Sequence, residues 1–533
     1  MKSRHLALIS LCILAIACMM AVPSRLVRKV EAVCPKCPPP PPPPPTVGEF
    51  GGPLAGLSTS ITNLFNGGYG TFVIKWDPIR GLGPVSTKTG CFTCHGAGVD
   101  VLTGTAGDTS NVTGQRYGKW NPDGTFNYLD GSGTYPENEG GPIVHGVSNA
   151  AFDTLPSCNV MTIAKNGATE SGTTVTITTT AAHGFQVGQM AQIQNVPVSG
   201  YNGIFQILTA QGTTFTYNNT VSGLATSGGG TAQNLPHEVV PADATVVSTV
   251  RSPQLFGLGL VDNIPDSAIL ANTGITKPYG ITGTANLVPD ENGVLRPGKF
   301  GQKLNNVSLF QFIAGAEFNE LGITTSSGPF GVPSQFNPNE HLPQGLPYPA
   351  ACQTDPHSPQ DVSQSNMIKM TQFESLLAPL PPQTPTQQTI AGEEVFNNIG
   401  CSVCHIQSFT TQQNVKLRTT TGGQTAVIAS LSNVTFSPYS DFLLHDMGAG
   451  ESGGIPFQPG GAGQATLTMW RTAPLWGLSN ILAKAGGLMH DNTSTTIDAA
   501  IRRHGGEAAQ VVTSYEGLNS TDASNLLAFL GSL

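Results

Sequence analysis

Hydrophobic and polar positions repeat with the period of a helix in the last third of the chain. Val395, Phe396 and Ile399 fall on one face of a short helix predicted over residues 390–400, and a glycine ends it. A closing helix is expected after residues 520–522, where Ser-Thr-Asp precedes a run rich in large apolar residues.

Strict alternation replaces the helical period between residues 160 and 233. The stretch 173–178 reads Thr-Thr-Val-Thr-Ile-Thr and 205–208 reads Phe-Gln-Ile-Leu, with glycine-containing turns between such runs. We expect a small all-β insert here, in which His183 is a turn residue. An insert without a binding role is the favoured interpretation, and binding of carbohydrate or of a partner is the alternative.

The N-terminus has the pattern of an export signal. Lys2, Arg4 and His5 precede an apolar run over residues 6–22, which is short for a membrane span. We therefore predict a signal peptide or N-terminal anchor over residues 1–32 and a periplasmic or extracellular protein. A Cys/Pro-rich linker over residues 33–48 follows, with an unbroken proline run that favours extended polyproline II and acts as a spacer or membrane tether.

The amino-acid composition limits the classes of molecule that the protein can bind. Charged residues make up 11% of the chain, Gly and Pro number 64 and 41, and the net charge is −9. Extensive loops follow from the glycine and proline content. Nucleic acid is excluded as a partner, because binding it depends on clustered Lys and Arg that neutralise phosphates.

Two CxxCH motifs carry the candidate chemistry. Cys91 and Cys94 precede His95, and Cys401 and Cys404 precede His405, in a set of 10 cysteines. Thiols at this spacing can add to the two vinyl groups of one porphyrin, and the histidine then becomes the proximal ligand of the iron.

The alternatives to haem attachment fit less well. Zinc ribbons place their CxxC pairs about 15–20 residues apart, whereas these motifs begin at residues 91 and 401. A thioredoxin-like motif needs a βαβ setting, which the pattern does not show. We predict two covalently bound haem c groups, with iron ligated by His95 and His405. Cys158 and Cys352 remain, and whether they form a disulfide stays open.

An internal repeat accompanies the two motifs. Residues 251–258 read Arg-Ser-Pro-Gln-Leu-Phe-Gly-Leu, and residues 471–478 read Arg-Thr-Ala-Pro-Leu-Trp-Gly-Leu. One copy per CxxCH indicates duplicated haem c domains, which we place at residues 49–380, interrupted by the insert, and at 385–533. The predicted fold is mainly α: two cytochrome c-like haem domains with extensive loops, plus a small all-β insert in the first.

Longer motifs resemble a known family. They are Tyr-Ser-Asp-Phe-Leu-Leu-His-Asp-Met-Gly at 439–448, Trp-Arg-Thr-Ala-Pro-Leu-Trp-Gly at 470–477, His-Gly-Gly-Glu-Ala at 504–508, and the 251–258 and 300–324 segments of the first half. The chain resembles the di-haem oxidoreductases, peroxidases related to bacterial di-haem cytochrome c peroxidases and the MauG enzymes. The resemblance covers residues 78–158 and 236–533.

The resemblance implies a sixth ligand for the second haem. In relatives this ligand follows a His-Asp-Gly-type turn by fourteen residues, which here leads from His490 to His504. A helix from residue 497 to 504 would hold His504 toward the iron opposite His405. Met447, Met489 and His490 are competing ligands, and a packing role for His504 is the other interpretation.

The first haem is implied to be the catalytic one. No equally clear sixth ligand is present, and His145 is the nearest candidate. Glu320 precedes Leu-Gly as the distal carboxylate of relatives does, and it could move a proton between peroxide oxygens; a solvated helix residue is the alternative. Gln302 stands where relatives usually have Trp, which puts rapid electron transfer between the haems in doubt.

Three functions are consistent with these features. The leading one is an oxidoreductase that takes electrons from a cytochrome or cupredoxin at the C-terminal haem and reduces a small oxidant such as hydrogen peroxide at the N-terminal haem. The opposite polarity, oxidation of a substrate, stays open. The alternatives are a non-enzymatic di-haem electron-transfer cytochrome, or a surface-binding protein that uses the β insert.

Overall fold

The structure is a computed structural model of the chain. It describes residues 44, 46–48, 51–76, 85–86, 90–95, 113–123, 126–127, 147–148, 160–185, 187, 190–219, 221–235, 245–321, 323, 362–453 and 467–533. Residues 42–533 form one compact unit. The predictions for the signal segment, most of the linker, His145, Cys158 and Cys352 lie outside the described residues. Within the described part, no helix has the length and apolar character needed to cross a membrane.

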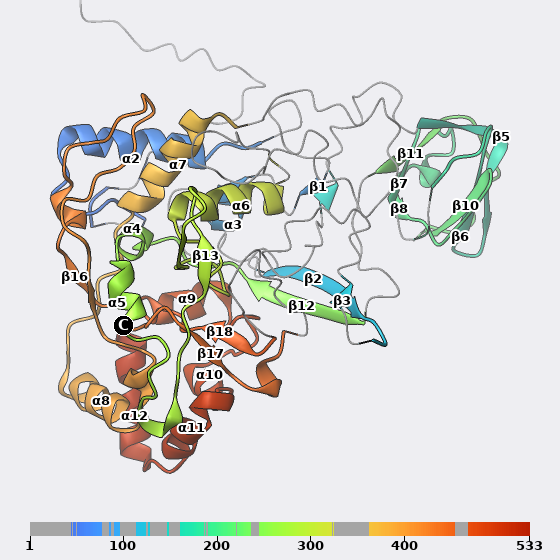
Figure 1. The fold of residues 1–533 in the computed structure, drawn as a ribbon. Helices are drawn as coiled ribbons and strands as arrows, with labels where there is room; N and C mark the ends of the chain where they lie inside the picture. The colour runs from blue at the N-terminus through green and yellow to red at the C-terminus, as the bar shows by residue number, and fades with distance from the viewer. Residues whose placement is uncertain are drawn as a thin grey trace, which may run out of the picture. The chain divides into compact units, whose positions relative to one another are not determined.

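Helices make up the larger part of the described regular structure (Figure 1). The α-helices are α2 (Thr59–Phe72), α3 (Cys91–His95), α4 (Leu258–Asp262), α5 (Asp266–Leu270), α6 (Leu309–Leu321), α7 (Gln364–Leu376), α8 (Gln387–Asn398), α9 (Leu478–Ala485), α10 (Ile497–Arg502), α11 (Ala509–Glu516) and α12 (Ser520–Ser532). Short 3-10 turns are η5 (Ser199–Tyr201), η6 (Pro278–Gly280), η9 (Cys401–Val403), η10 (Ala429–Leu431), η11 (Ala449–Glu451) and η12 (Gly506–Ala508).

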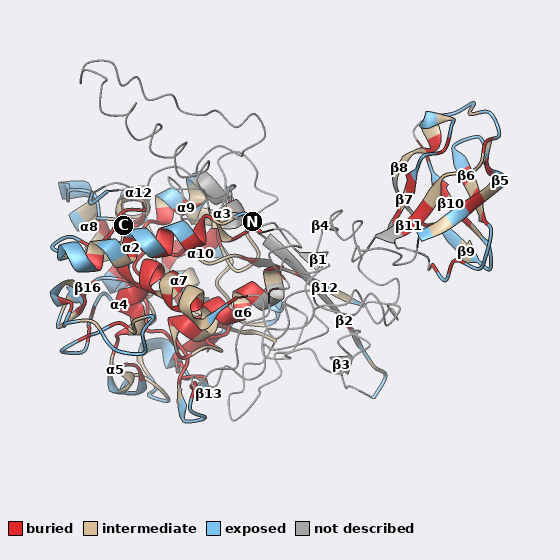
Figure 2. Ribbon diagram, turned by 90° about the horizontal axis from the view of Figure 1, so that it is seen from above, coloured by how far each residue is buried: buried red, intermediate tan, exposed pale blue. Residues whose placement is uncertain are grey.

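A single large core joins segments from both halves of the sequence. Phe373 on α7 packs at 5.0 Å between ring centres against both Phe65 and Phe72 of α2. In the same core, Phe396 of α8 meets Phe529 of α12 at 5.4 Å. Figure 2 shows the buried residues concentrated along α4, α6 and α7. Burial of these aromatic rings stabilises the fold, because each removes a large apolar area from water.

Strands form several separate sheets. Outside the insert they are β1 (Val85–Ser86), β2 (Thr113–Trp120), β3 (Phe126–Asn127), β4 (Val147–Ser148), β12 (Val246–Arg251), β13 (Leu287–Pro289), β14 (Leu295–Pro297), β15 (Phe409–Thr410), β16 (Thr435–Phe436), β17 (Leu444–Asp446) and β18 (Met469–Arg471). β12, β2 and β3 form a three-stranded sheet, and β1–β4, β13–β14, β15–β16 and β17–β18 are pairs. The longest pairing outside the insert joins Val246–Arg251 of β12 antiparallel to residues 113–118 of β2.

The alternating region folds as a seven-stranded sheet with a core of its own. Its strands are β5 (Val160–Ser171), β6 (Thr174–Thr179), β7 (Met190–Gln194), β8 (Gly203–Gln206), β9 (Thr209–Gln211), β10 (Thr214–Asn218) and β11 (Thr231–Leu235), in the spatial order β8-β7-β11-β5-β6-β10-β9. Val175 and Ile177 of β6 are buried while their threonine neighbours are not, as alternation predicts. His183 is buried, and its ring contacts Thr214 O and Phe185 N, which is a structural role.

The predicted fold class is wrong. Among the described residues helices account for 34% and strands for 20%, so the protein is not mainly α. Nor is β structure confined to a small all-β insert, because β2, β3 and β12 form a sheet outside it and the insert is itself a seven-stranded sheet. Pairing between strands more than 120 residues apart produces this sheet, and no local periodicity signals such a pairing.

Two of the expected helices form where the pattern placed them, and the third is shorter than expected. α8 spans Gln387–Asn398 with a capping box at Thr386, and α12 spans Ser520–Ser532 with Asn519 as its N-cap. α10 ends at Arg502, so His504 follows the helix and does not lie in it. The boundaries of the two haem domains stay a prediction.

Candidate functional site

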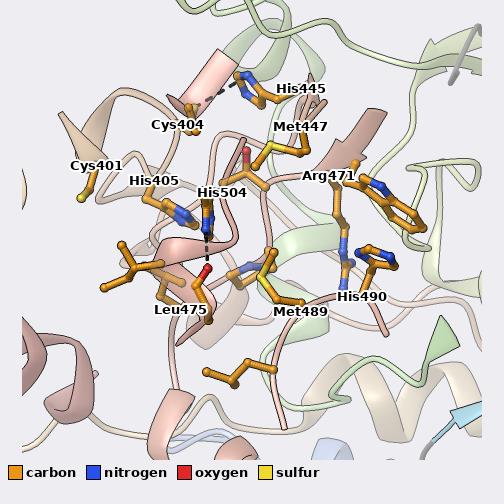
Figure 3. Close-up of a pocket in the computed structure, with 18 of the residues that line it drawn as sticks. Cys401, Cys404, His405, His445, Met447, Arg471, Leu475, Met489, His490 and His504 are labelled. Atoms are coloured by element: carbon orange, nitrogen blue, oxygen red, sulfur yellow. Dashed lines mark hydrogen bonds between the residues drawn. The ribbon is translucent and has the colours of Figure 1, made fainter. Parts of the chain in front are cut away.

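A large cavity opens beside the second CxxCH segment. It holds about 1430 Å³ of space between protein atoms, including solvent at its mouth, and its wall is mostly apolar. Cys401, Cys404, His405 and His504 all line it. Figure 3 shows Cys401 and Cys404 on one side of the cavity and His490 on the other. The structure thus brings four of the predicted site residues together.

Local structure explains how the CxxCH residues reach the cavity. α8 ends before Ile399, and Gly400 takes φ 101°, a left-handed conformation that suits glycine. The chain then turns at once into η9, whose first residue is Cys401. The ring of Phe396 on α8 packs beside the ring of His405, with 6.4 Å between the ring centres. The opening helix therefore positions the motif by a direct side-chain contact.

The two histidines are oriented in the same way by backbone carbonyls. His405 donates from Nδ1 to Tyr439 O at 2.9 Å, and His504 donates from Nδ1 to Ala500 O at 2.8 Å. This fixes the tautomer that leaves each Nε2 with its lone pair free. Burial lowers the pKa of His405 to about 4 and lowers that of His504 as well. Both rings are therefore neutral at pH 7, the form that binds a metal.

The distance between the two rings matches a metal ion held between them. The ring centres of His405 and His504 lie 6.5 Å apart. Two imidazoles that each bind one ion at about 2 Å place their ring centres roughly 6 Å apart. Phe396, Leu488, Ile497 and Ala500 supply an apolar lining. The donor set and the lining fit a haem seated between the two histidines.

The competing ligands also line the cavity, but one of them is engaged elsewhere. Met447, Met489 and His490 are all part of the wall. His490 stacks on Trp470 with 3.7 Å between ring centres, and its Nδ1 lies 3.5 Å from a Glu451 carboxylate oxygen. His504 has no such engagement at Nε2 among the described residues. The geometry favours His504 over His490.

A buried charge network lies behind Cys404. His445 is 2% exposed and hydrogen-bonds through Nε2 to Asp441 at 3.1 Å and through Nδ1 to Glu507 at 2.9 Å. Lys277 donates to Asp441 at 3.2 Å and to Val403 O at 3.0 Å. Burial alone would lower the pKa of His445. Its hydrogen bonds to Asp441, to the Cys404 thiol (Sγ to Nδ1, 3.7 Å) and to Glu507 outweigh burial and raise the pKa to about 12. His445 is therefore a cation that holds this side of the motif in place.

Two arginines stand in the cavity wall. Arg251 ends β12 and Arg471 ends β18, and both line the cavity. Gln302 links the two segments. Its side-chain Nε2 donates to the backbone carbonyl of Arg251 at 2.9 Å, and its backbone carbonyl accepts from the backbone N–H of Arg471 at 3.3 Å. The residue that departs from the family pattern is thus part of this wall.

The first CxxCH segment forms the short helix α3, with Cys91 packed against the core. Burial lowers the pKa of His95 to about 4, so its ring is neutral. Glu320 lies near the end of α6 and is half-buried, whereas Glu317 one turn earlier is buried at 1% exposure. Within the part of the chain that the structure describes, no contact joins either carboxylate to His95. The role of Glu320 stays a prediction.

Sequence reasoning missed His445, Glu507 and Asp441 as supporting residues. All three stand inside the motifs at 439–448 and 504–508, so a signal was present. What the motifs did not reveal is that the two segments meet, 62 residues apart in sequence, through the contact between His445 and Glu507.

The cavity with its facing histidines defines a haem-binding protein as the class, and comparison with known proteins identifies the family. Residues 228–533 match the family model described as "Di-haem oxidoreductase, putative peroxidase". Because the match covers more than half of the chain, the protein belongs to the di-haem oxidoreductase family, and haem is its cofactor. The first CxxCH motif, at residues 91–95, lies before the matched region.

Other comparisons are sparse. No curated protein matches the sequence. A solved structure, hydrazine synthase of Kuenenia stuttgartiensis pressurised with 20 bar xenon, is similar at 15% identity with a TM-score of 0.21. The similarity covers 34% of this chain and 58% of that one. The chain thus spans less than two thirds of the length of that structure.

Proposed function

We propose that this protein is an exported di-haem c-type oxidoreductase. Electrons from a donor protein would enter at the C-terminal haem and pass to the N-terminal haem, where a small oxidant such as hydrogen peroxide is reduced. Family membership supports redox chemistry with haem. The observation that carries the proposal is the pair His405 and His504, 6.5 Å apart across the cavity with both Nδ1 atoms engaged.

The two haem sites have different tasks in this proposal. A bound haem supplies an iron that accepts and returns one electron at a time. His405 and His504 would hold the second haem from two sides, which would leave no open side for an oxidant and would suit electron transfer. His95 would ligate the first iron on one side only, so that an oxidant can bind on the other.

Covalent attachment is part of the same proposal. Cys401 and Cys404 line the same cavity as His405, and Cys91 and Cys94 precede His95 in the same order. Each thiol would form one thioether bond to a vinyl group of its haem. The predicted export signal and proline spacer support a location in the periplasm or outside the cell, where a cytochrome or cupredoxin would be the electron donor.

Glu320 would handle protons at the first site. Reduction of one hydrogen peroxide to two waters consumes two electrons and two protons and breaks the O–O bond. A carboxylate can accept a proton from one peroxide oxygen and return it to the other, so that water leaves. The position of Glu320 on α6, half-buried, is compatible with such a role.

Absorption and EPR spectra of the purified holoprotein test the proposal. Haem that survives denaturing electrophoresis supports covalent attachment. We expect one low-spin signal from the second site and one high-spin ferric signal that shifts when peroxide or cyanide is added. Two low-spin haems that respond to neither would overturn the enzymatic proposal and leave a non-enzymatic electron-transfer cytochrome.

A further inference from the structure

The two copies of the sequence repeat have the same local structure. Each begins at an arginine that ends a strand, β12 or β18, and each continues into a helix, α4 or α9. The helix N-cap is Gly257 in one copy and Gly477 in the other, with φ values of 72° and 69°. This left-handed conformation explains why glycine recurs at the same place in both copies.

The copies also pack against one another. A Cβ on Gly257 would lie 2.7 Å from the ring of Trp476, and a Cβ on Gly477 would lie 2.7 Å from the ring of Phe256. The two aromatic rings themselves are 6.0 Å apart. Each aromatic residue thus covers the glycine of the other copy. This reciprocal contact brings the first residues of both copies, Arg251 and Arg471, to one cavity.

Both arginines have unpaired N–H groups inside the protein. Arg251 is 6% exposed, and within the described part of the chain its Nε and Nη1 have no hydrogen-bond partner; Nε of Arg471 is likewise buried there without one. Burial lowers the pKa of each to about 10, and for Arg471 the neighbouring Arg251 adds to the effect. Two buried guanidinium groups of like charge are unfavourable unless anions neutralise them.

The acidic residues of the described structure do not supply these anions. Glu451 is the one carboxylate among the residues that line this cavity. It already binds Arg503 through both oxygens, at 2.9 and 2.7 Å. A ligand with two negative groups would neutralise the two arginines where their side chains line the cavity.

We propose that Arg251 and Arg471 form a clamp for two carboxylates, and that these are the two propionates of the haem held between His405 and His504. This inference rests on the proposed haem site. Guanidinium groups bind carboxylates through paired, charge-assisted hydrogen bonds. One half of the clamp comes from the segment that follows the first CxxCH, so the N-terminal half of the chain contributes directly to the C-terminal haem.

A consequence is electrostatic control of the second haem. Cations beside the propionates disfavour the ferric state, which carries one more positive charge than the ferrous state. Loss of either guanidinium charge should therefore lower the midpoint potential of this haem. The first haem should be unaffected.

The test uses the full-length holoprotein with Arg251→Gln, Arg471→Gln and the corresponding Lys variants. Arg296→Gln is the matched control, because Arg296 binds Asp266 and does not line the cavity. Potentiometric titration follows the low-spin haem. We expect a lower midpoint potential in both Gln variants, a smaller shift in the Lys variants and none in Arg296→Gln. An unchanged potential in haem-loaded Gln variants would overturn the clamp.

Haem content separates the remaining outcomes. Loss of the second haem from the Gln variants, with retention in the Lys and control variants, supports the clamp; equal loss in Arg296→Gln contradicts it. If wild-type protein carries no haem at Cys401 and Cys404, the proposed function itself fails. Free anions are the other source of the same chemistry, so inorganic phosphate is titrated into wild-type holoprotein. A phosphate-dependent shift that both Gln variants lack would overturn the propionate assignment.

Discussion

At the scale of single residues, the proposed second haem site depends on hydrogen bonds between side chains and the backbone. His405 and His504 each direct Nδ1 to a carbonyl oxygen, at 2.9 and 2.8 Å. Neither bond involves another titratable group, so the tautomer of each ring is insensitive to pH over the neutral range. His445, by contrast, is held by carboxylates, and its contribution depends on pH.

In the proposed site, replacing His504 with Gly would remove one of the two side chains that hold the second haem. The low-spin EPR signal of that haem should convert to high spin, while the signal of the other haem stays unchanged. His490→Gly is the matched variant, since His490 lines the same cavity but stacks on Trp470. The assignment is wrong if His490→Gly causes the conversion and His504→Gly does not.

The pKa of His445, raised from 6.5 to about 12, predicts a pH-dependent stability. Protonated His445 therefore stabilises the fold, and this contribution is fully present below pH 6.5. It is lost as pH rises toward the folded-state pKa of about 12. The pKa values of Asp441 and Glu507 are lowered despite burial, because both carboxylates bind His445. Their contribution is present above the unfolded pKa of about 4 and is lost on acidification.

Urea denaturation of wild type and His445→Gln at several pH values checks this. The free energy of unfolding of wild type should exceed that of His445→Gln by the largest amount near pH 5.5 to 6.5. This difference should shrink at higher pH, by at most about 1.4 kcal/mol per pH unit. A difference that stays constant from about pH 6 to pH 9 would show that His445 is neutral in the folded protein.

At the scale of elements, the CxxCH motif is positioned by the close approach of α8 and α12. A Cβ on Gly392 would lie 2.0 Å from Asn525 O, so the two helices meet backbone to backbone at this glycine. Phe396 and Phe529 continue the contact one turn further on. The helical periodicity of residues 390–400 and 520–530 predicts both helices because that signal is local. It does not predict which glycine lies at the crossing.

Gly392→Ala should force α8 and α12 apart and destabilise the protein by about 1–3 kcal/mol, the usual cost of overpacking. Thermal unfolding measures the effect. Gly450→Ala is the control, because a Cβ there meets nothing within 4 Å. Equal unfolding temperatures for the two variants would contradict the close approach.

At the scale of the whole molecule, the β module is self-contained. It has a buried cluster of its own, formed by residues of the seven-stranded sheet. Val160 and Gln233 are register partners on adjacent strands, so the two ends of the module lie side by side. A short linker can therefore replace residues 160–233 without stretching the rest of the chain.

Deletion of residues 160–233 should leave the spectrum and the content of the second haem unchanged. Peroxide turnover should also be retained if the module has no part in the mechanism. Haem quantification and steady-state assays on the deletion variant measure both. Normal haem content with lost turnover would assign the module a role in the reaction or in binding a partner.

The sequence by itself determined the features that depend on neighbouring residues. Two thiols and a histidine within five positions predict haem, and short-range periodicity predicts α8, α12 and the alternating strands of the module. The motif spacing implied by the family resemblance proposed His504, although the helix before it ends two residues earlier than expected.

Only the tertiary structure decided which distant segments meet. It paired β12 with β2, which made the mainly α prediction wrong, and it joined His445 to Glu507 and brought Arg251 and Arg471 to one cavity. These contacts arise between residues 62 to more than 200 positions apart. These contacts are stabilised by burial and by charge interactions that exist only in the folded state. Local sequence patterns therefore do not predict them.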